Sequence, residues 1–318
     1  MRFLLTLLVS TFIAGKVHAH QPLISVDWLQ KQLQNNRIVI LDLRNAIDKG
    51  GIEKFRQGHI PGSIHSDYLK AGWRVKKNNI PGLLPDPSGF EKLVKNIGIS
   101  KDTHVILVPA GVSSTDFGSS ARAYWQFKVY GHNKVSILDG GYEAWKKMMP
   151  HLVEKGNGKI PAKGNFKAAY SAKHYINTKN VARISKNGGA ILLDGRNEEQ
   201  WKGKSKHPAA RAPGNIPRSK WQWQGDTYNT QSNRLKTEAE LTQLFEDVMD
   251  QPIVSYCNTG HWAATNWFVL SEILGHKDVK LYDGSMTEWA SNTNFPLTKG
   301  QTKFDDLKDW IERTLNKS

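Results

Sequence analysis

The only cysteine of the chain, Cys257, follows the apolar run Ile253–Tyr256 and opens a short polar loop. The loop reads Cys257-Asn258-Thr259-Gly260-His261-Trp262. A thiol that serves only for packing is usually surrounded by apolar side chains. A lone thiol in a polar loop that contains glycine indicates a nucleophile instead.

Two elements must position this thiol. The run Ile253–Tyr256 predicts a buried strand, and apolar residues at helical spacing beyond the loop predict a helix that begins near Trp262. In open parallel sheets, ligands bind beyond the carboxyl ends of the strands. The N-terminus of the following helix adds N–H groups and the positive end of its dipole. With the backbone freedom of Gly260, this arrangement predicts a cradle that favours a thiolate or another anion.

Other residues are candidates for binding a substrate. The candidates are Asn258, Thr259, Gly260, His261 and Trp262 in the loop, with Arg196 and Arg211 before it. We expect Trp262 to form a wall of the pocket, whereas His261 is either a proton donor or a solvated loop residue. Arg196, two positions after Asp194, either braces the site or forms a structural ion pair. Arg211 could attract the charge of an anionic substrate.

The chain consists of two similar halves. Three segments return in the same order: residues 38–44 as 190–196, 58–63 as 214–219, and 131–145 as 275–289. Small changes in loop length account for the differences in spacing. Such ordered self-similarity indicates a tandem duplication.

Both halves alternate strand and helix signals. Ser25 can cap a helix that carries Val26, Leu29 and Leu33 on one face, and Ile38–Leu41 then reads as a buried strand. This alternation predicts α/β domains built on parallel sheets. We predict a first domain over residues 20–150, a linker rich in Lys, Gly and Pro over 151–165, and a second domain over 166–318. A closing helix is expected at residues 302–315.

The first nineteen residues have the features of a cleavable signal peptide. Arg2 precedes the apolar run Phe3–Ala14, and the small residue Ala19 marks a cleavage site. Gly15 and Lys16 interrupt the run too early for a spanning helix, which needs about 20 apolar residues. We therefore expect a periplasmic or secreted protein that is not attached to a membrane after cleavage.

The composition narrows the range of partners. The chain has 318 residues, 39% of them apolar, and a formal net charge of +15. Its lysines are scattered, and no nucleic-acid-binding motif is present, so the charge favours small anions over nucleic acid. No metal or organic cofactor is expected.

Taken together, the motifs resemble those of the tandem-domain rhodaneses, which are thiosulfate and 3-mercaptopyruvate sulfurtransferases. The resemblance rests on the D-x-R after the first strand, the G-H-I-P-G-S box, the cysteine loop, and the D-G-G or D-G-S with a following tryptophan. It covers nearly all of the mature chain. It implies two domains, each a five-stranded parallel sheet flanked by helices, of which only the second is active.

The resemblance also implies the chemistry. Cys257 would take sulfane sulfur from a small anionic donor as a persulfide and pass it to cyanide, a small thiol or a protein thiol. In the first domain, counting from the strand Val105–Val108 places Ala110 opposite Cys257, while counting back from Gly131 places Ser113 there. Neither residue can form a persulfide.

Departures from the family pattern leave the donor open. Relatives that use thiosulfate tend to have basic residues where this chain has Asn258 and Thr259, and Thr259 is closer to the mercaptopyruvate group. Gln200 stands where both groups usually have an arginine. Trp262 stands where they usually have a hydroxyl residue.

Two alternatives to the sulfurtransferase remain. A cysteine phosphatase or arsenate reductase needs Cys-x5-Arg, but Ala263 occupies the arginine position, which makes that chemistry unlikely. A non-enzymatic carrier of sulfane sulfur, or a docking module, remains an alternative.

Overall fold

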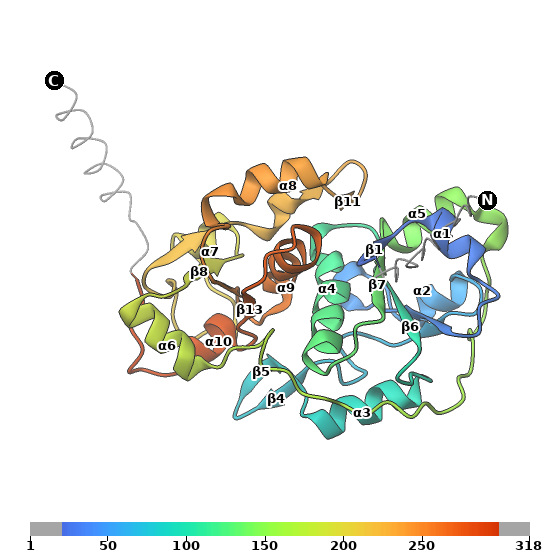
Figure 1. Cartoon of the computed structure of the whole chain (residues 1–318), viewed down its shortest axis with the longest axis horizontal. Helices are drawn as coiled ribbons and strands as arrows, with labels where there is room; N and C mark the ends of the chain where they lie inside the picture. Colours follow the sequence, from blue (N-terminus) through green and yellow to red (C-terminus); the bar gives the residue numbers. More distant parts are fainter. Residues whose placement is uncertain (1–20, 299–318) are drawn as a thin grey trace, which may run out of the picture.

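Two parallel sheets form the centres of two domains that lie side by side in the computed structural model (Figure 1). The structure describes residues 21–298. The signal peptide predicted for residues 1–19 and the helix predicted for 302–315 lie outside this range. Within it, no helix is both long enough and apolar enough to cross a membrane.

The first domain has the expected five strands. Their order is β1 (Leu23–Ile24), β7 (Val135–Leu138), β6 (His104–Val108), β2 (Ile38–Asp42) and β3 (Ile64–His65), and all neighbours pair in parallel. The helices of this domain are α1 (Val26–Lys31), α2 (Ile52–Gln57), α3 (Pro87–Asn96), α4 (Ser114–Val129) and α5 (Gly141–Met148). The predicted cap is confirmed, because the hydroxyl of Ser25 accepts a hydrogen bond from the Trp28 N–H at 3.1 Å. Leu33 lies beyond the end of α1.

The second domain has four strands instead of the expected five. Their order is β13 (Val279–Leu281), β12 (Ile253–Tyr256), β8 (Ile191–Asp194) and β9 (Ser219–Trp221), again parallel. At the outer edge of β13, a single parallel bridge joins Tyr175 to Leu281. This bridge replaces the fifth strand, because the approaching chain makes only a brief contact before α6 begins. The helices here are α6 (Thr178–Asn187), α7 (Glu198–Trp201), α8 (Glu238–Phe245), α9 (His261–Phe268) and α10 (Ser285–Trp289).

The connection between the domains is an extended segment that packs on the first domain. After α5, the chain contains no helix longer than the short turn Pro150–Leu152 until α6. The N–H groups of Gly164 and Phe166 donate to the carbonyls of Lys95 and Ile99. The domain limits at residues 150 and 166 remain a prediction.

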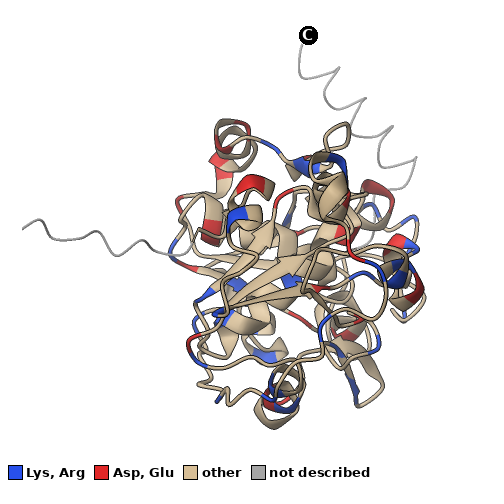
Figure 2. Cartoon of the chain, turned by 90° about the vertical axis from the view of Figure 1, so that its right-hand side faces the viewer, with Lys and Arg blue, Asp and Glu red and all other residues tan. Residues whose placement is uncertain are grey.

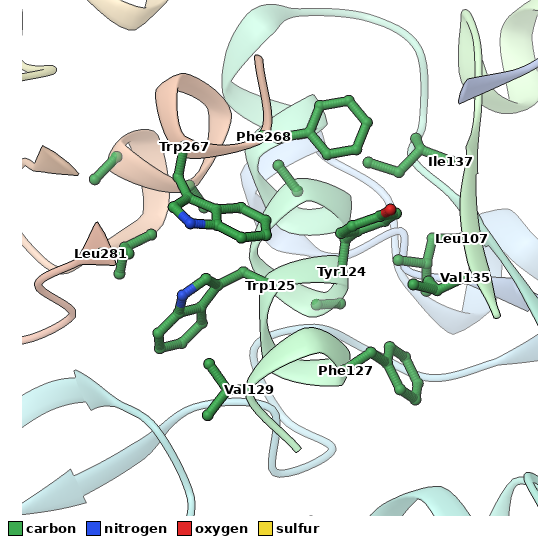
Figure 3. Packing of buried hydrophobic residues seen from close by; sticks show 14 of the residues in the cluster. Leu107, Tyr124, Trp125, Phe127, Val129, Val135, Ile137, Trp267, Phe268 and Leu281 are labelled. Carbon is green, nitrogen blue, oxygen red and sulfur yellow. The ribbon is translucent and has the colours of Figure 1, made fainter. Parts of the chain in front are cut away.

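One hydrophobic core is shared by the two domains. Helices α4 and α9 pack against each other between the sheets, and Tyr124 of α4 contacts Phe268 of α9 edge to face (Figure 3). Phe117 of α4 contacts the same ring edge to face. Gly118 allows this close approach, because a Cβ there would lie 2.9 Å from Nε2 of His261. At the other end of the interface, the Tyr124 hydroxyl donates to Glu272 at 2.8 Å. Separate small cores fill the outer face of each sheet.

We expect the fragment 165–318 not to fold alone, because it would expose the apolar face of α9 that α4 covers. Thermal unfolding followed by circular dichroism should show a cooperative transition for the full chain and none for the fragment. A fragment that unfolds cooperatively at the temperature of the full chain would contradict the shared core.

Candidate active site

Cys257 directly follows β12, and its side chain is only 2% exposed. The next residues turn into α9, which begins at His261. Gly260 has a left-handed φ of 69°, and a Cβ on it would collide with Nη1 of Arg122. The expected strand–loop–helix arrangement is therefore confirmed, and the loop requires glycine at this position for two separate reasons.

Ser285 closes the loop from the neighbouring segment. Its hydroxyl oxygen accepts hydrogen bonds from the N–H groups of Cys257 at 3.0 Å and Gly260 at 3.1 Å, and its proton goes to the carbonyl of Tyr282 at 2.8 Å. Among residues 21–298, the N–H groups of Asn258 and Thr259 have no acceptor. Ser285 thus fixes the amides of Cys257 and Gly260, whereas those of Asn258 and Thr259 are left for an anion.

Gln200, one of the departures from the family pattern, lies in this site. Its amide oxygen accepts a hydrogen bond from Nδ2 of Asn258 at 2.8 Å. A neutral pair therefore occupies the place where an arginine was expected. Thr259 is buried on the other side of the loop, next to Gly82 of the first domain.

His261 is neither solvated nor a free proton donor, so both alternatives for it were wrong. It is buried between the domains, where Nδ1 lies 3.1 Å from the Tyr68 hydroxyl and Nε2 lies 2.8 Å from the Thr115 carbonyl. These partners match a neutral ring that is protonated on Nε2. Burial and the nearby cation Arg74 lower the pKa of His261 to about 3. The ring joins the start of α9 to the first domain.

Arg122 of α4 is a buried cation beside the loop that sequence reasoning missed. Its Nη1 donates to the carbonyl of Gly260 at 3.1 Å, and its Nη2 donates to the carbonyl of Gly82 at 3.1 Å. Asp283 accepts at 3.4 Å and supplies the opposite charge. Arg122 and Tyr68 both lie within electrostatic range of Cys257.

The remaining candidates have structural contacts. Arg196 binds the carboxylate of Asp194, at 2.6 Å from Nη2, and also donates to the Gly214 carbonyl, so its ion pair braces the end of β8. Arg211 donates to the carbonyl of Ala290, at the opposite end of α10 from the end that contacts Cys257. Arg211 therefore does not join the loop. Trp262 is partly buried against the shared core.

No metal centre is apparent near the thiol. Among the described residues, no group of three or more His, Cys, Asp or Glu side chains could hold a metal ion. The chemistry available at the site is that of the Cys257 thiol, the loop amides and the cations around them. The absence of a cofactor remains a prediction.

The family to which this arrangement belongs follows from comparison with known protein families. The model of the rhodanese-like domain matches residues 25–148 and again residues 177–292, one match in each half. The chain belongs to the rhodanese family. Its tandem duplication is thereby confirmed, and its curated relatives place it among the sulfurtransferases.

Several relatives resemble the chain over most of its length. A putative thiosulfate sulfurtransferase of Mycolicibacterium smegmatis is 31% identical over 87% of this chain and 98% of its own. A sulfur carrier protein, TtuD, of Thermus thermophilus is 30% identical over 89% of this chain and 99% of its own. The crystal structure of SseA from Escherichia coli, described as a 3-mercaptopyruvate sulfotransferase, matches with a TM-score of 0.71 at 26% identity. That match covers 83% of this chain and 98% of SseA.

The first rhodanese-like domain has Pro109, not Ala110 or Ser113, at the position of Cys257. Val108 pairs with Asp42 as Tyr256 pairs with Asp194, so the two strands end in the same register. The carbonyl of Pro109 accepts from Tyr142 just as that of Cys257 accepts from Met286. Both predicted counterparts were wrong: the count from the strand went one residue too far, and the count back from Gly131 is shifted because the first half has four residues more than the second between this position and that glycine.

The loop of the first domain is closed by a carboxylate from its own helix. Asp116 of α4 is buried and accepts from the N–H groups of Val112 at 2.6 Å, Ser113 at 3.0 Å and Gly111 at 3.3 Å. Burial raises the pKa of Asp116 to about 6, although these three donors oppose the change. The loop of the second domain has N–H groups that can bind a ligand. In the loop of the first domain, Asp116 already accepts from the three N–H groups named here.

The buried His261 predicts a pH dependence of stability. Its folded-state pKa of about 3 lies below the ordinary 6.5, so the unfolded state binds more protons between these values. Its contribution to stability is therefore complete above pH 6.5 and is lost as the pH falls toward 3, by up to about 1.4 kcal/mol per pH unit.

Urea unfolding at pH 7 and pH 5 measures this effect. The wild type should lose about 2 kcal/mol more between the two values than His261→Gln, in which this group no longer titrates. Equal losses in the two proteins would show that His261 does not resist protonation.

Proposed function

We propose that the protein transfers sulfane sulfur through a persulfide on Cys257. The observation that carries the proposal is the placement of the only thiol in a loop with unoccupied N–H groups at Asn258 and Thr259. A persulfide is an anion at neutral pH, and such groups stabilise negative charge more strongly in a buried site than in water. The membership in the rhodanese family supports the same chemistry.

In the first half-reaction, the Cys257 thiolate attacks the outer sulfur of the donor. The lone pair of Sγ forms the new S–S bond, and the bond between that sulfur and the donor breaks. With thiosulfate, the bonding pair leaves on sulfite. With 3-mercaptopyruvate, the C–S pair passes to carbon, which takes up a proton to give pyruvate.

In the second half-reaction, an acceptor attacks the outer sulfur of the persulfide. The lone pair of cyanide or of a thiolate forms the new bond to sulfur, and the S–S pair returns to Sγ of Cys257. The products are thiocyanate or a new persulfide, together with the free enzyme thiolate. The neutral His261 donates to Thr115 and accepts from Tyr68, so we assign it a positioning role.

The donor should be a small anion. The relatives named above include a putative thiosulfate sulfurtransferase and a 3-mercaptopyruvate enzyme, and both donors are anionic. The loop itself carries no cationic side chain, and Gln200 is neutral. Lys and Arg are spread over many elements (Figure 2), which gives only a diffuse, salt-screened attraction.

A sulfur carrier is a second candidate function. It is favoured by the similarity to the Thermus thermophilus sulfur carrier protein over almost its whole length. A carrier would form the same Cys257 persulfide but would release sulfur only to a partner protein. Turnover with cyanide or a small thiol as the sole acceptor separates the enzyme from the carrier.

Export is also a proposal, based on the N-terminal segment with the apolar run Phe3–Ala14 and the small residue Ala19. We propose cleavage after this residue and delivery to the periplasm or the medium. N-terminal sequencing of the native protein should then begin at His20. A native protein that retains Met1 would contradict export through this segment.

Replacement of Cys257 by Ser should abolish sulfur transfer, because the chain contains no other thiol. Intact-mass analysis after incubation with donor should show the gain of one sulfur atom in the wild type and none in Cys257→Ser. As a folding control, the two proteins should unfold at similar temperatures. Sulfur transfer by a folded Cys257→Ser protein would rule out the proposed mechanism.

A further inference from the structure

We propose that Arg74 of the first domain binds the anionic group of the sulfur donor and thereby helps to select it. This inference rests on the proposed function, since it assigns a substrate contact for the same reaction. It assigns to the first domain a direct part in substrate recognition. The charge that the loop and Gln200 lack would then come from a segment distant in sequence.

Arg74 reaches the rim of the cysteine loop. It immediately precedes the hairpin formed by β4 (Val75–Lys77) and β5 (Ile80–Leu83), which extends toward α10 of the second domain (Figure 1). A Cβ on Gly82 would collide with Nη2 of Arg74 and would lie 3.0 Å from Cβ of Thr259. The guanidinium and the loop therefore flank the same glycine.

The guanidinium of Arg74 lacks the carboxylate and carbonyl partners that Arg122 and Arg196 have. Arg122 and Arg196 each bind a carboxylate and backbone carbonyls. Among residues 21–298, Arg74 has neither a hydrogen bond nor an ion pair, and its Nε is buried without an acceptor. Buried donors without a partner are rare in folded proteins and call for an explanation, such as a ligand.

The surroundings of Arg74 suit an incoming anion. It lies within electrostatic range of Tyr68, Arg122, His261 and His207. Both histidines have a pKa below the ordinary value, through burial first and then the charge of Arg74. Among the described residues, no carboxylate of the protein pairs with Arg74. Its positive charge therefore favours the binding of a carboxylate or sulfonate group of a ligand.

The position of Arg74 also indicates which donors gain most. The guanidinium of Arg74 meets the loop across Gly82 at Thr259, two residues beyond Cys257. A carboxylate that several bonds separate from the transferred sulfur can reach this rim while its sulfur meets Cys257. In thiosulfate, the charged oxygens are on the sulfur atom that is bonded directly to the transferred sulfur. We therefore expect Arg74 to favour 3-mercaptopyruvate over thiosulfate.

A purely structural role for Arg74 predicts a different result. Its Cζ lies 5.6 Å from the centroid of the Tyr68 ring, so it could serve only to hold the hairpin by a cation–π contact. Loss of that contact would impair every donor alike. Loss of an anion contact would impair only anionic donors.

The test is single-turnover loading of Cys257 in the full chain, followed by intact mass at increasing donor concentration. The variants are Arg74→Ala, Arg74→Lys and the control Lys76→Gln, which removes one charge from an exposed position of the same hairpin. The donors are 3-mercaptopyruvate, thiosulfate and the neutral amide of 3-mercaptopyruvate, which can give up its sulfur in the same way and leaves pyruvamide. Arg74→Ala should raise the half-saturating concentration of 3-mercaptopyruvate about ten- to hundredfold, thiosulfate less, and the amide not at all. Arg74→Lys should be intermediate, and Lys76→Gln should match the wild type.

Each other outcome has a distinct meaning. Unchanged half-saturation of 3-mercaptopyruvate in Arg74→Ala overturns the assignment while the persulfide mechanism stands. An equal loss for all three donors also overturns it, in favour of the structural role. If the wild type gains no sulfur from any donor, the proposed function itself fails.

Discussion

A buried positive charge between the domains is the constraint on which the active site depends. The guanidinium of Arg122 is fully buried, so it must keep its carboxylate and carbonyl partners or impose a large desolvation cost. Those partners are Asp283 and the carbonyls of Gly82 and Gly260. They belong to three separate segments, one of them the cysteine loop. The position of the loop is therefore fixed from the first domain, although its own residues all come from the second.

This dependence explains why a domain without a thiol is retained. Its counterpart of the cysteine loop begins at Pro109 and is closed by Asp116, and the next helix presents the Thr115 carbonyl to His261. This part of the first domain thus supports the start of α9 from across the interface, while α4 and α9 share one apolar core. The second domain contains the nucleophile, and the first domain holds it in position.

Local patterns in the sequence were sufficient for the strands, the loop and the duplication, because these depend on residues close together in the chain. The strand before Cys257, the Ser25 cap and the left-handed Gly260 were all predictable in this way. The roles of Ser285 and Arg122 were not, since each contacts residues far away in sequence. The buried position of His261 was not predictable either, because its partners, Tyr68 and Thr115, lie in the other domain. Pro109 was missed because the two halves differ by four residues between this position and the next shared glycine, which shifts a count back from it, and the reduced fifth strand left no signal in its residues.

Amide hydrogen exchange of the cysteine loop tests most directly whether the buried pair fixes that loop. The double variant Arg122→Met/Asp283→Asn removes both charges and so leaves neither buried alone, which should preserve the fold. We expect faster exchange at residues 257–261 than in the wild type, with slow exchange retained in β6 and β12. Wild-type exchange throughout the loop in this variant would show that Arg122 does not hold it.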